Sequence, residues 1–146
     1  MTAKTSPTVC VRHRFSASPE RVFDAWLDPL TAAKWLFATY TGEMVRVEID
    51  AQVGGRFIFV DRRDREDVEH IGEYLEIDRP RRLAFTFAVP KYSPEFTRVR
   101  VEIVPVDSGC DLTLTHEGVL PEYLEQTEKG WGMILGRLAI AVGETI

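Results

Sequence analysis

The sequence contains little cysteine and no long uninterrupted apolar run. Its two cysteines, Cys10 and Cys110, form no C-x-x-C pair, which excludes a disulfide scaffold and a cysteine-based metal site. We expect both to be buried, reduced thiols. The apolar stretch 133–142 is interrupted by Arg137 and is far shorter than the roughly 20 residues that cross a bilayer. Residues 1–7 lack the apolar segment of a signal peptide, so no membrane span and a cytoplasmic location are expected.

Positive charge is also scarce. The 18 Lys and Arg residues are outnumbered by 23 Asp and Glu, and the net charge is −5, so no nucleic-acid partner is expected. The mixed-sign run 61–67 is typical of a solvated hairpin tip. His13, His70 and His116 are far apart and lie in no metal-binding motif, so neither a metal nor a cofactor is expected. No G-x-S-x-G nucleophile motif is present.

What the chain does have is ordinary globular composition and regular patterning. Its 146 residues, 45% apolar and 28% charged, predict one domain over residues 8–146 after a loose tail at 1–7. Residues 9–15 alternate as a strand, and Ser18-Pro19 and Asp28-Pro29 each begin a short helix. From Met44 a period of two predicts six further strands joined by short turns, which is typical of an antiparallel meander.

The chain closes with helical spacing. Leu124, Trp131, Leu135 and Leu138 predict a helix of 20-odd residues, which at about 1.5 Å per residue is a rod of roughly 30 Å. We therefore predict an α+β fold in which a curved antiparallel sheet of about seven strands wraps around this helix.

Five segments, in this order, resemble a known superfamily. They are SPERVFDAW at 18–26, VGGRF at 53–57, GEYLEIDRPRRLAFT at 72–86, LTLTHEG at 112–118 and GWGMIL at 130–135. Together they resemble the START-like, or SRPBCC, superfamily, and within it the branch named for activator of heat shock protein 90 ATPase homologues. The resemblance covers roughly residues 8–144. It implies a helix-grip fold with a cavity between the sheet and the long helix, where superfamily members bind lipids, sterols, polyketides or hormones.

The leading functional hypothesis is accordingly a protein that binds a small hydrophobic ligand. Aromatic side chains are expected to converge beneath the long helix, either as plain core or as the lining of a ligand cavity. The three glycines Gly130, Gly132 and Gly136 indicate either close packing of that helix on the sheet or room at a cavity wall. The candidate ligand-binding residues are Trp35, Phe57, Phe59, Glu73, Phe85, Phe87, Val101, His116, Trp131 and Leu135.

Two polar residues on apolar faces suggest a second hypothesis. His116 continues the face of Leu112 and Leu114, and Glu73 shares a period-two face with Ile71 and Leu75. Both can be satisfied structural groups, ligand anchors, or an acid–base pair of a cyclase or isomerase. A register shift by one residue would place Tyr74 inward in place of Glu73.

A third hypothesis comes from the family name alone. It is a co-chaperone-like interaction protein, although the sequence contains nothing that resembles the N-terminal chaperone-binding domain of the eukaryotic activators.

Overall fold

The computed structural model describes residues 8–37 and 42–143 of the chain. Seven strands form an antiparallel sheet in the order β1-β7-β6-β5-β4-β3-β2. Apart from β1, which pairs with β7 at one edge, neighbours in the chain are neighbours in the sheet, as the meander pattern predicts. The strands are β1 (Thr8–Phe15), β2 (Glu43–Ile49), β3 (Arg56–Arg63), β4 (Glu66–Asp78), β5 (Arg82–Phe87), β6 (Thr97–Val106) and β7 (Gly109–Glu117).

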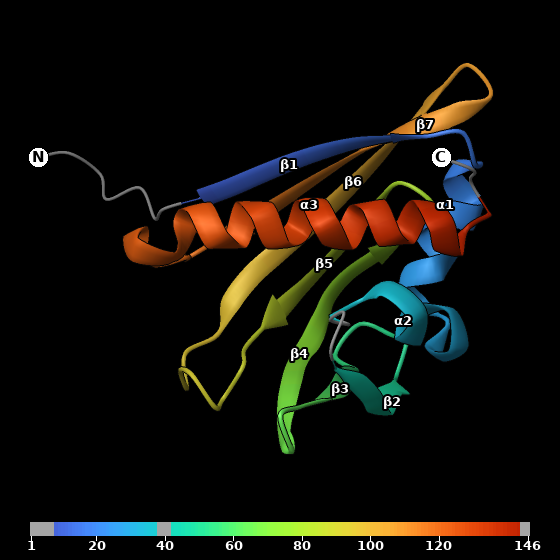
Figure 1. Cartoon of the computed structure of the whole chain (residues 1–146). Helices are drawn as coiled ribbons and strands as arrows, with labels where there is room; N and C mark the ends of the chain where they lie inside the picture. The colour runs from blue at the N-terminus through green and yellow to red at the C-terminus, as the bar shows by residue number, and fades with distance from the viewer. Residues whose placement is uncertain (1–7, 38–41, 144–146) are drawn as a thin grey trace, which may run out of the picture.

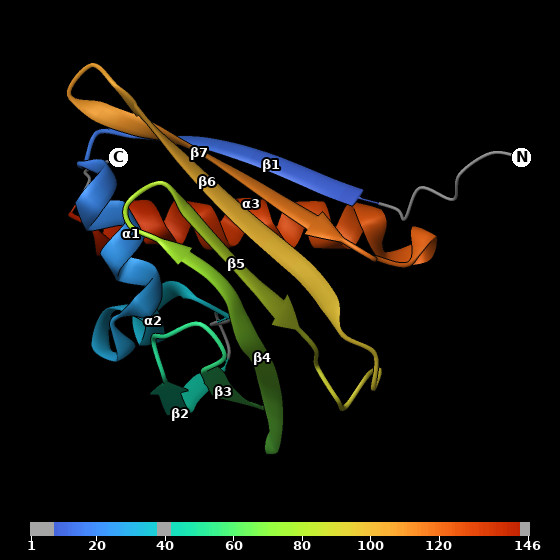
Figure 2. The same ribbon diagram turned by 180° about the vertical axis from the view of Figure 1, so that it is seen from behind.

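The helices lie on one face of this sheet. Helices α1 (Pro19–Leu27) and α2 (Pro29–Trp35) follow β1, and α3 (Leu124–Ala141) follows a single 3-10 turn, η1 (Pro121–Tyr123). Figure 1 shows α3 crossing the concave face of the sheet, with α1 and α2 gathered near its C-terminal end. Seen from behind, the strands lie in front of α3 and their outer face is uncovered (Figure 2). This is the predicted helix-grip architecture.

The two short helices begin where the sequence predicts. Ser18 caps α1, its Oγ accepting a hydrogen bond from the backbone N–H of Arg21 at 3.2 Å. Asp28 ends α1 and also caps α2, since its carboxylate accepts from the backbone N–H and the hydroxyl of Thr31. A proline follows each cap, where its fixed φ suits the first helical turn. The caps fix the sharp change of direction between the two helices.

The concave face and the helices enclose the core. Leu112 and Leu114 of β7, Val99 and Val101 of β6, and Leu135 of α3 are completely buried. Trp26 and Trp35 pack edge to face with ring centroids 4.7 Å apart. Full burial of one such side chain contributes about 1.5–3 kcal/mol, so this interior carries most of the stability of the fold.

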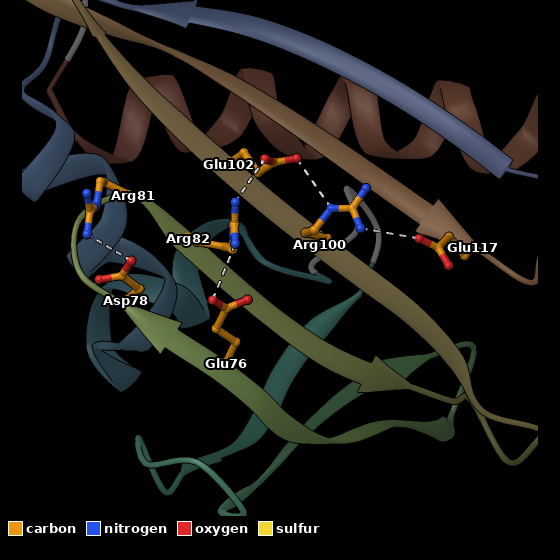
Figure 3. Close-up of polar contacts among 7 residues, drawn as sticks. All are labelled: Glu76, Asp78, Arg81, Arg82, Arg100, Glu102 and Glu117. Carbon is orange, nitrogen blue, oxygen red and sulfur yellow. Dashed lines mark hydrogen bonds and ion pairs between the residues drawn. The ribbon is translucent and has the colours of Figure 1, made fainter.

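Charged side chains cover the outer face. Figure 3 shows ion pairs that cross strands β4 to β7 there. Arg82 contacts Glu76 at 3.6 Å and Glu102 at 3.7 Å, and Arg100 contacts Glu102 at 3.3 Å and Glu117 at 3.5 Å. These groups are half-exposed, so each pair contributes at most about 1 kcal/mol. The outer face of the sheet is therefore the solvent-exposed face.

The structure corrects the prediction for Glu73. Tyr74 is buried in the core, with 3% of its surface exposed, whereas Glu73 lies on the opposite face of β4. The pairing of β4 with β5 shifts register between Tyr74 and Glu76, which inserts Leu75 as a bulge. Ile77, beyond the bulge, returns to the core side. A bulge reverses the alternation, so Ile71 and Ile77, which an unbroken period of two would place on one face, lie on opposite faces.

Three smaller expectations have other outcomes. Asp61 is fully buried rather than part of a solvated hairpin tip, because β3 extends to Arg63 and only the turn at Asp64 and Arg65 projects. Cys110 is buried as expected, but Cys10 is exposed. The loose tail expected at 1–7 lies outside the described residues.

Candidate ligand-binding site

A hollow opens between the N-terminal half of α3 and the connection from β5 to β6. It has two adjoining ends that share Phe87, Val89, Tyr92 and His116. We call it the α3 hollow. Its arginine end, lined also by Arg63 and Arg137, has a volume of about 440 Å³. Its β7 end, which reaches Gly118 and Tyr123, has a volume of about 590 Å³. Each volume lies in the range of roughly 300–1,000 Å³ that small-molecule sites occupy.

The floor of the α3 hollow is aromatic. Phe87 of β5 stacks on Phe37 with ring centroids 4.9 Å apart, and its edge meets His116 at 5.8 Å. Trp131 of α3 stands against His116 at 6.0 Å and against Phe37 at 6.0 Å. Such a surface contacts the flat or apolar body of a ligand through dispersion and burial of apolar area.

His116 is held by a directional chain of hydrogen bonds. The indole N–H of Trp131 donates to His116 Nδ1 at 3.0 Å, so this nitrogen carries no proton. Nε2 must then carry the proton and donates to Thr97 Oγ1 at 2.7 Å, and the Thr97 hydroxyl donates to the carbonyl of Phe87 at 3.0 Å. Burial lowers the pKa of His116 to about 4, so the ring is neutral at pH 7. These hydrogen bonds fix two walls of the hollow, Trp131 and the end of β5.

A second polar group lies at the arginine end. Arg63 donates to Asp61 Oδ2 at 2.6 Å, and its Nη2 lies 3.4 Å from His70 Nε2. His70 Nδ1 lies 3.3 Å from the carbonyl of Phe59, to which it donates. Burial, and next the charge of Arg63, lower the pKa of His70 to about 4. His70 is therefore also neutral, and the positive charge at this end belongs to the two arginines.

Asp61, Arg63 and His70 were not among the site residues predicted from the sequence. A period of two along each strand would have predicted them. On β3, every second residue from Phe57 to Arg63 lies on one face, and this face includes Asp61. On β4, every second residue from Val68 to Tyr74 lies on one face, and this face includes His70. Extending the apolar face of each strand into its charged end would have placed all three inward.

Phe37 was also missed. It follows α2 and is 5% exposed, with its ring against Phe57, His70 and Phe87. Its φ is 60°, a left-handed conformation that a bulky residue adopts only when its surroundings hold it there. No local pattern of residue types predicts this conformation, since the packing of distant strands imposes it.

The ten predicted site residues fall into three groups. Phe87, His116 and Trp131 line the α3 hollow. Glu73 lies on the opposite face of the sheet from His116. The remaining six are buried in the core, where the space among the aromatic rings measures only about 10 Å³: Trp35, Phe57, Phe59, Phe85, Val101 and Leu135.

The helix glycines border open space. A Cβ at Gly130, Gly132 or Gly136 would meet nothing within 4 Å, so close packing on the sheet does not explain them. Gly130 lines the arginine end of the α3 hollow, whereas Gly132 is exposed. At Gly130 the missing side chain leaves room at the wall.

A second hollow, of about 660 Å³, lies against the outer face. Its lining combines the charged residues Glu48, Arg56 and Glu73 with apolar residues that include Phe57 and Phe96, so two predicted site residues, Phe57 and Glu73, border it. Within residues 8–37 and 42–143, no three His, Cys, Asp or Glu side chains gather as a metal site would require. Among the described helices, none is both long and apolar enough to traverse a bilayer.

Solved structures resemble this fold along almost the whole chain. A protein of Chromobacterium violaceum is 30% identical, with a TM-score of 0.86 over 94% of this chain and 98% of that one. An AHSA1-like protein of Aeromonas hydrophila is 22% identical, with a TM-score of 0.81 over 93% and 92%. A protein of Nitrosomonas europaea is 20% identical, with a TM-score of 0.79 over 92% and 93%. The last two show likeness of fold alone. Among curated proteins none matches.

A family model settles the affiliation. The model described as "Activator of Hsp90 ATPase homolog 1-like protein" matches residues 16–143, a span that begins just before α1 and ends just after α3. This span contains both capped helices, six of the seven strands and every residue named above as lining the α3 hollow. The chain therefore belongs to the family of Activator of Hsp90 ATPase homolog 1-like proteins.

Proposed function

We propose that this protein binds a small, largely apolar molecule in the α3 hollow. One observation carries the proposal: aromatic side chains from β5, α3 and the end of α2 meet around a space of ligand size, whereas the space among the aromatic rings of the described core measures only about 10 Å³. The polar groups on its walls are few and are fixed in orientation, which is the usual composition of a small-molecule site. The family match supports it because START-like relatives share this fold.

The positions of Glu73 and His116 argue against acid–base catalysis by this pair. The two side chains lie on opposite faces of the sheet, so no substrate can touch both. His116 is also engaged at both ring nitrogens, by Trp131 and by Thr97. A general base needs a free lone pair within about 3 Å of the substrate proton. His116 is better described as a residue that positions the wall.

Phe87→Ala tests the binding site. N-phenyl-1-naphthylamine is a neutral aromatic probe whose fluorescence rises in an apolar site. We expect the wild type to bind it and Phe87→Ala to lower the affinity roughly tenfold or more, because the probe loses the ring that forms the floor. Phe96→Ala is the matched control, since Phe96 is exposed and is not part of the hollow. Equal affinity in the Phe87→Ala variant and the wild type would refute the assignment.

Native mass spectra of gently purified protein seek the natural ligand. A reproducible extra mass that is lost on denaturation and is reduced in Phe87→Ala supports the proposal and gives the weight of the ligand. The same extra mass, unreduced in Phe87→Ala, would place the ligand elsewhere.

An interaction with an Hsp90-type chaperone is the second candidate, and the family description is what supports it. A pull-down with the purified chaperone tests it directly. Near-equal stoichiometry would support this function, and recovery no higher than with bare resin would reject it.

A further inference from the structure

The charges around the α3 hollow differ in sign from those of the whole chain. The molecule carries 23 acidic and 18 basic residues. At the arginine end, however, the described lining contains Arg63 and Arg137 and no carboxylate. At the β7 end, Glu95 is the acidic residue of the described lining. An apolar hollow with two guanidinium groups at one end has a local potential that favours an anion.

The two arginines approach the hollow from different elements. Arg137 lies on the face of α3 that also presents Thr127, Gly130 and Ile134, at spacings of three, four and three residues along the helix. Arg63 is at the end of β3, with 28% of its side chain exposed. Groups supplied by both a helix and a strand are held by the fold rather than by one mobile loop.

Asp61 orients Arg63 without using all of its donors. A guanidinium carries five N–H donors in a fixed plane. In the described part of the chain, the contacts of Arg63 are one N–H to Asp61 and one to His70. The plane is thereby fixed, and N–H groups remain that match the fork of a carboxylate, sulfonate or phosphate.

The histidines at the hollow do not compete for an anion. His116 and His70 each use both ring nitrogens inside the protein. They hold the walls, while the arginines supply the charge.

We propose that the ligand of the α3 hollow is an amphipathic anion, with an apolar or aromatic body on Phe87 and Trp131 and an acidic head group toward Arg137 and Arg63. This inference rests on the proposed function, because it names the ligand class of the same hollow. It goes further in assigning the arginine end as the part that selects for charge.

A matched pair of probes tests the proposal. 8-Anilinonaphthalene-1-sulfonate has the same ring system as N-phenyl-1-naphthylamine and differs from it by one sulfonate. We expect the wild type to bind the sulfonate about tenfold more tightly than the neutral probe, the gain of one charge-assisted contact. Arg137→Gln should reduce the preference several-fold, with Arg63 still present, and should lower the affinity for the sulfonate far more than the affinity for the neutral probe. Arg137→Lys should keep most of the preference.

Arg137 is the better position to substitute, because removing Arg63 would leave the buried Asp61 without its cation. The matched control is Arg98→Gln, since Arg98 is an exposed residue of β6 that does not line the hollow. It should leave both affinities at their wild-type values.

The results separate the two proposals. Phe87-dependent binding of the neutral probe with no preference for the sulfonate overturns the anionic ligand and leaves the proposed function standing. A preference for the sulfonate that Arg137→Gln leaves undiminished also overturns it, as does an equal loss of affinity for both probes. If Phe87→Ala leaves the affinity for both probes unchanged, the proposed function itself is refuted.

Discussion

At the scale of single residues, the two buried histidines link the site to the fold. His116 joins α3, β6 and β5 through Trp131, Thr97 and the carbonyl of Phe87. His70 joins Arg63 to the backbone of β3. Both are neutral, so protonation would break a hydrogen bond that each currently accepts. The walls of the α3 hollow are therefore sensitive to acid.

This sensitivity predicts the pH dependence of stability. An unfolded histidine has a pKa of about 6.5, whereas burial lowers the pKa of His70 and of His116 to about 4. Between these values the unfolded chain binds protons that the folded chain does not, so stability falls as the pH falls from about 6.5 to about 4. Each histidine accounts for a loss of about 3 kcal/mol over this window. Arg63, Asp61 and the backbone carbonyls are the groups facing His70.

Urea unfolding at a series of pH values checks this prediction. Near pH 5 the slope of the unfolding free energy should include the uptake of about two protons by these histidines. His116→Gln should reduce the uptake by about one, because the amide of Gln can accept from Trp131 and donate to Thr97 but does not titrate. At pH 8, where no histidine is protonated in either state, the difference in unfolding free energy between the variant and the wild type measures the change in packing alone. A slope that is unchanged in His116→Gln would show that His116 is already protonated in the fold.

At the scale of elements, β4 shows which features local sequence patterns predict and which they do not. Its C-terminal end and its place in the sheet were predictable because alternation and turn residues are local, but its start at Glu66 was not, because it lies in the charged run 61–67 that was expected to be a hairpin tip. The bulge at Leu75 was not, because it arises from how β4 pairs with β5. Close approach of β5 also constrains Gly72, because a Cβ there would lie 1.9 Å from the carbonyl oxygen of Thr86, so only glycine fits. The bulge is why Tyr74, and not Glu73, faces the core.

Two glycines of helix α3 provide a test of stability at this scale. Gly130→Ala and Gly132→Ala should each raise the unfolding free energy by up to about 1 kcal/mol, because alanine favours the helix and both sites have free space. Thermal unfolding measures this gain.

Leucine at the same two positions tests whether Gly130 borders the ligand. Gly130→Leu should fill part of the arginine end and lower the affinity for N-phenyl-1-naphthylamine roughly tenfold or more, whereas Gly132→Leu, on the exposed side, should not. Equal effects of the two leucines would mean that Gly130 does not border the ligand.

At the scale of the whole molecule, the sequence predicted the fold much better than the site. The order of elements and the amphipathic terminal helix leave few ways to bury the apolar faces, so the helix-grip arrangement follows from them. The position of the empty space does not follow, because it depends on how side chains from helices and strands far apart in the sequence fill one interior. Trp35, Phe59 and Phe85, for which the sequence left plain core and cavity lining open, are buried in the core. The space lies instead where β5 ends and α3 begins.

The most direct test of the central claim is the indole region of a ¹H–¹⁵N spectrum during titration with N-phenyl-1-naphthylamine. The chain has three tryptophans, and their N–H groups differ in surroundings: Trp131 donates to His116 at the hollow, Trp35 donates to Ala25 in the core, and Trp26 is buried between them. Binding in the α3 hollow predicts a saturable shift of the Trp131 signal with the Trp35 signal unmoved. A Trp131 signal that stays in place throughout the titration would contradict the account.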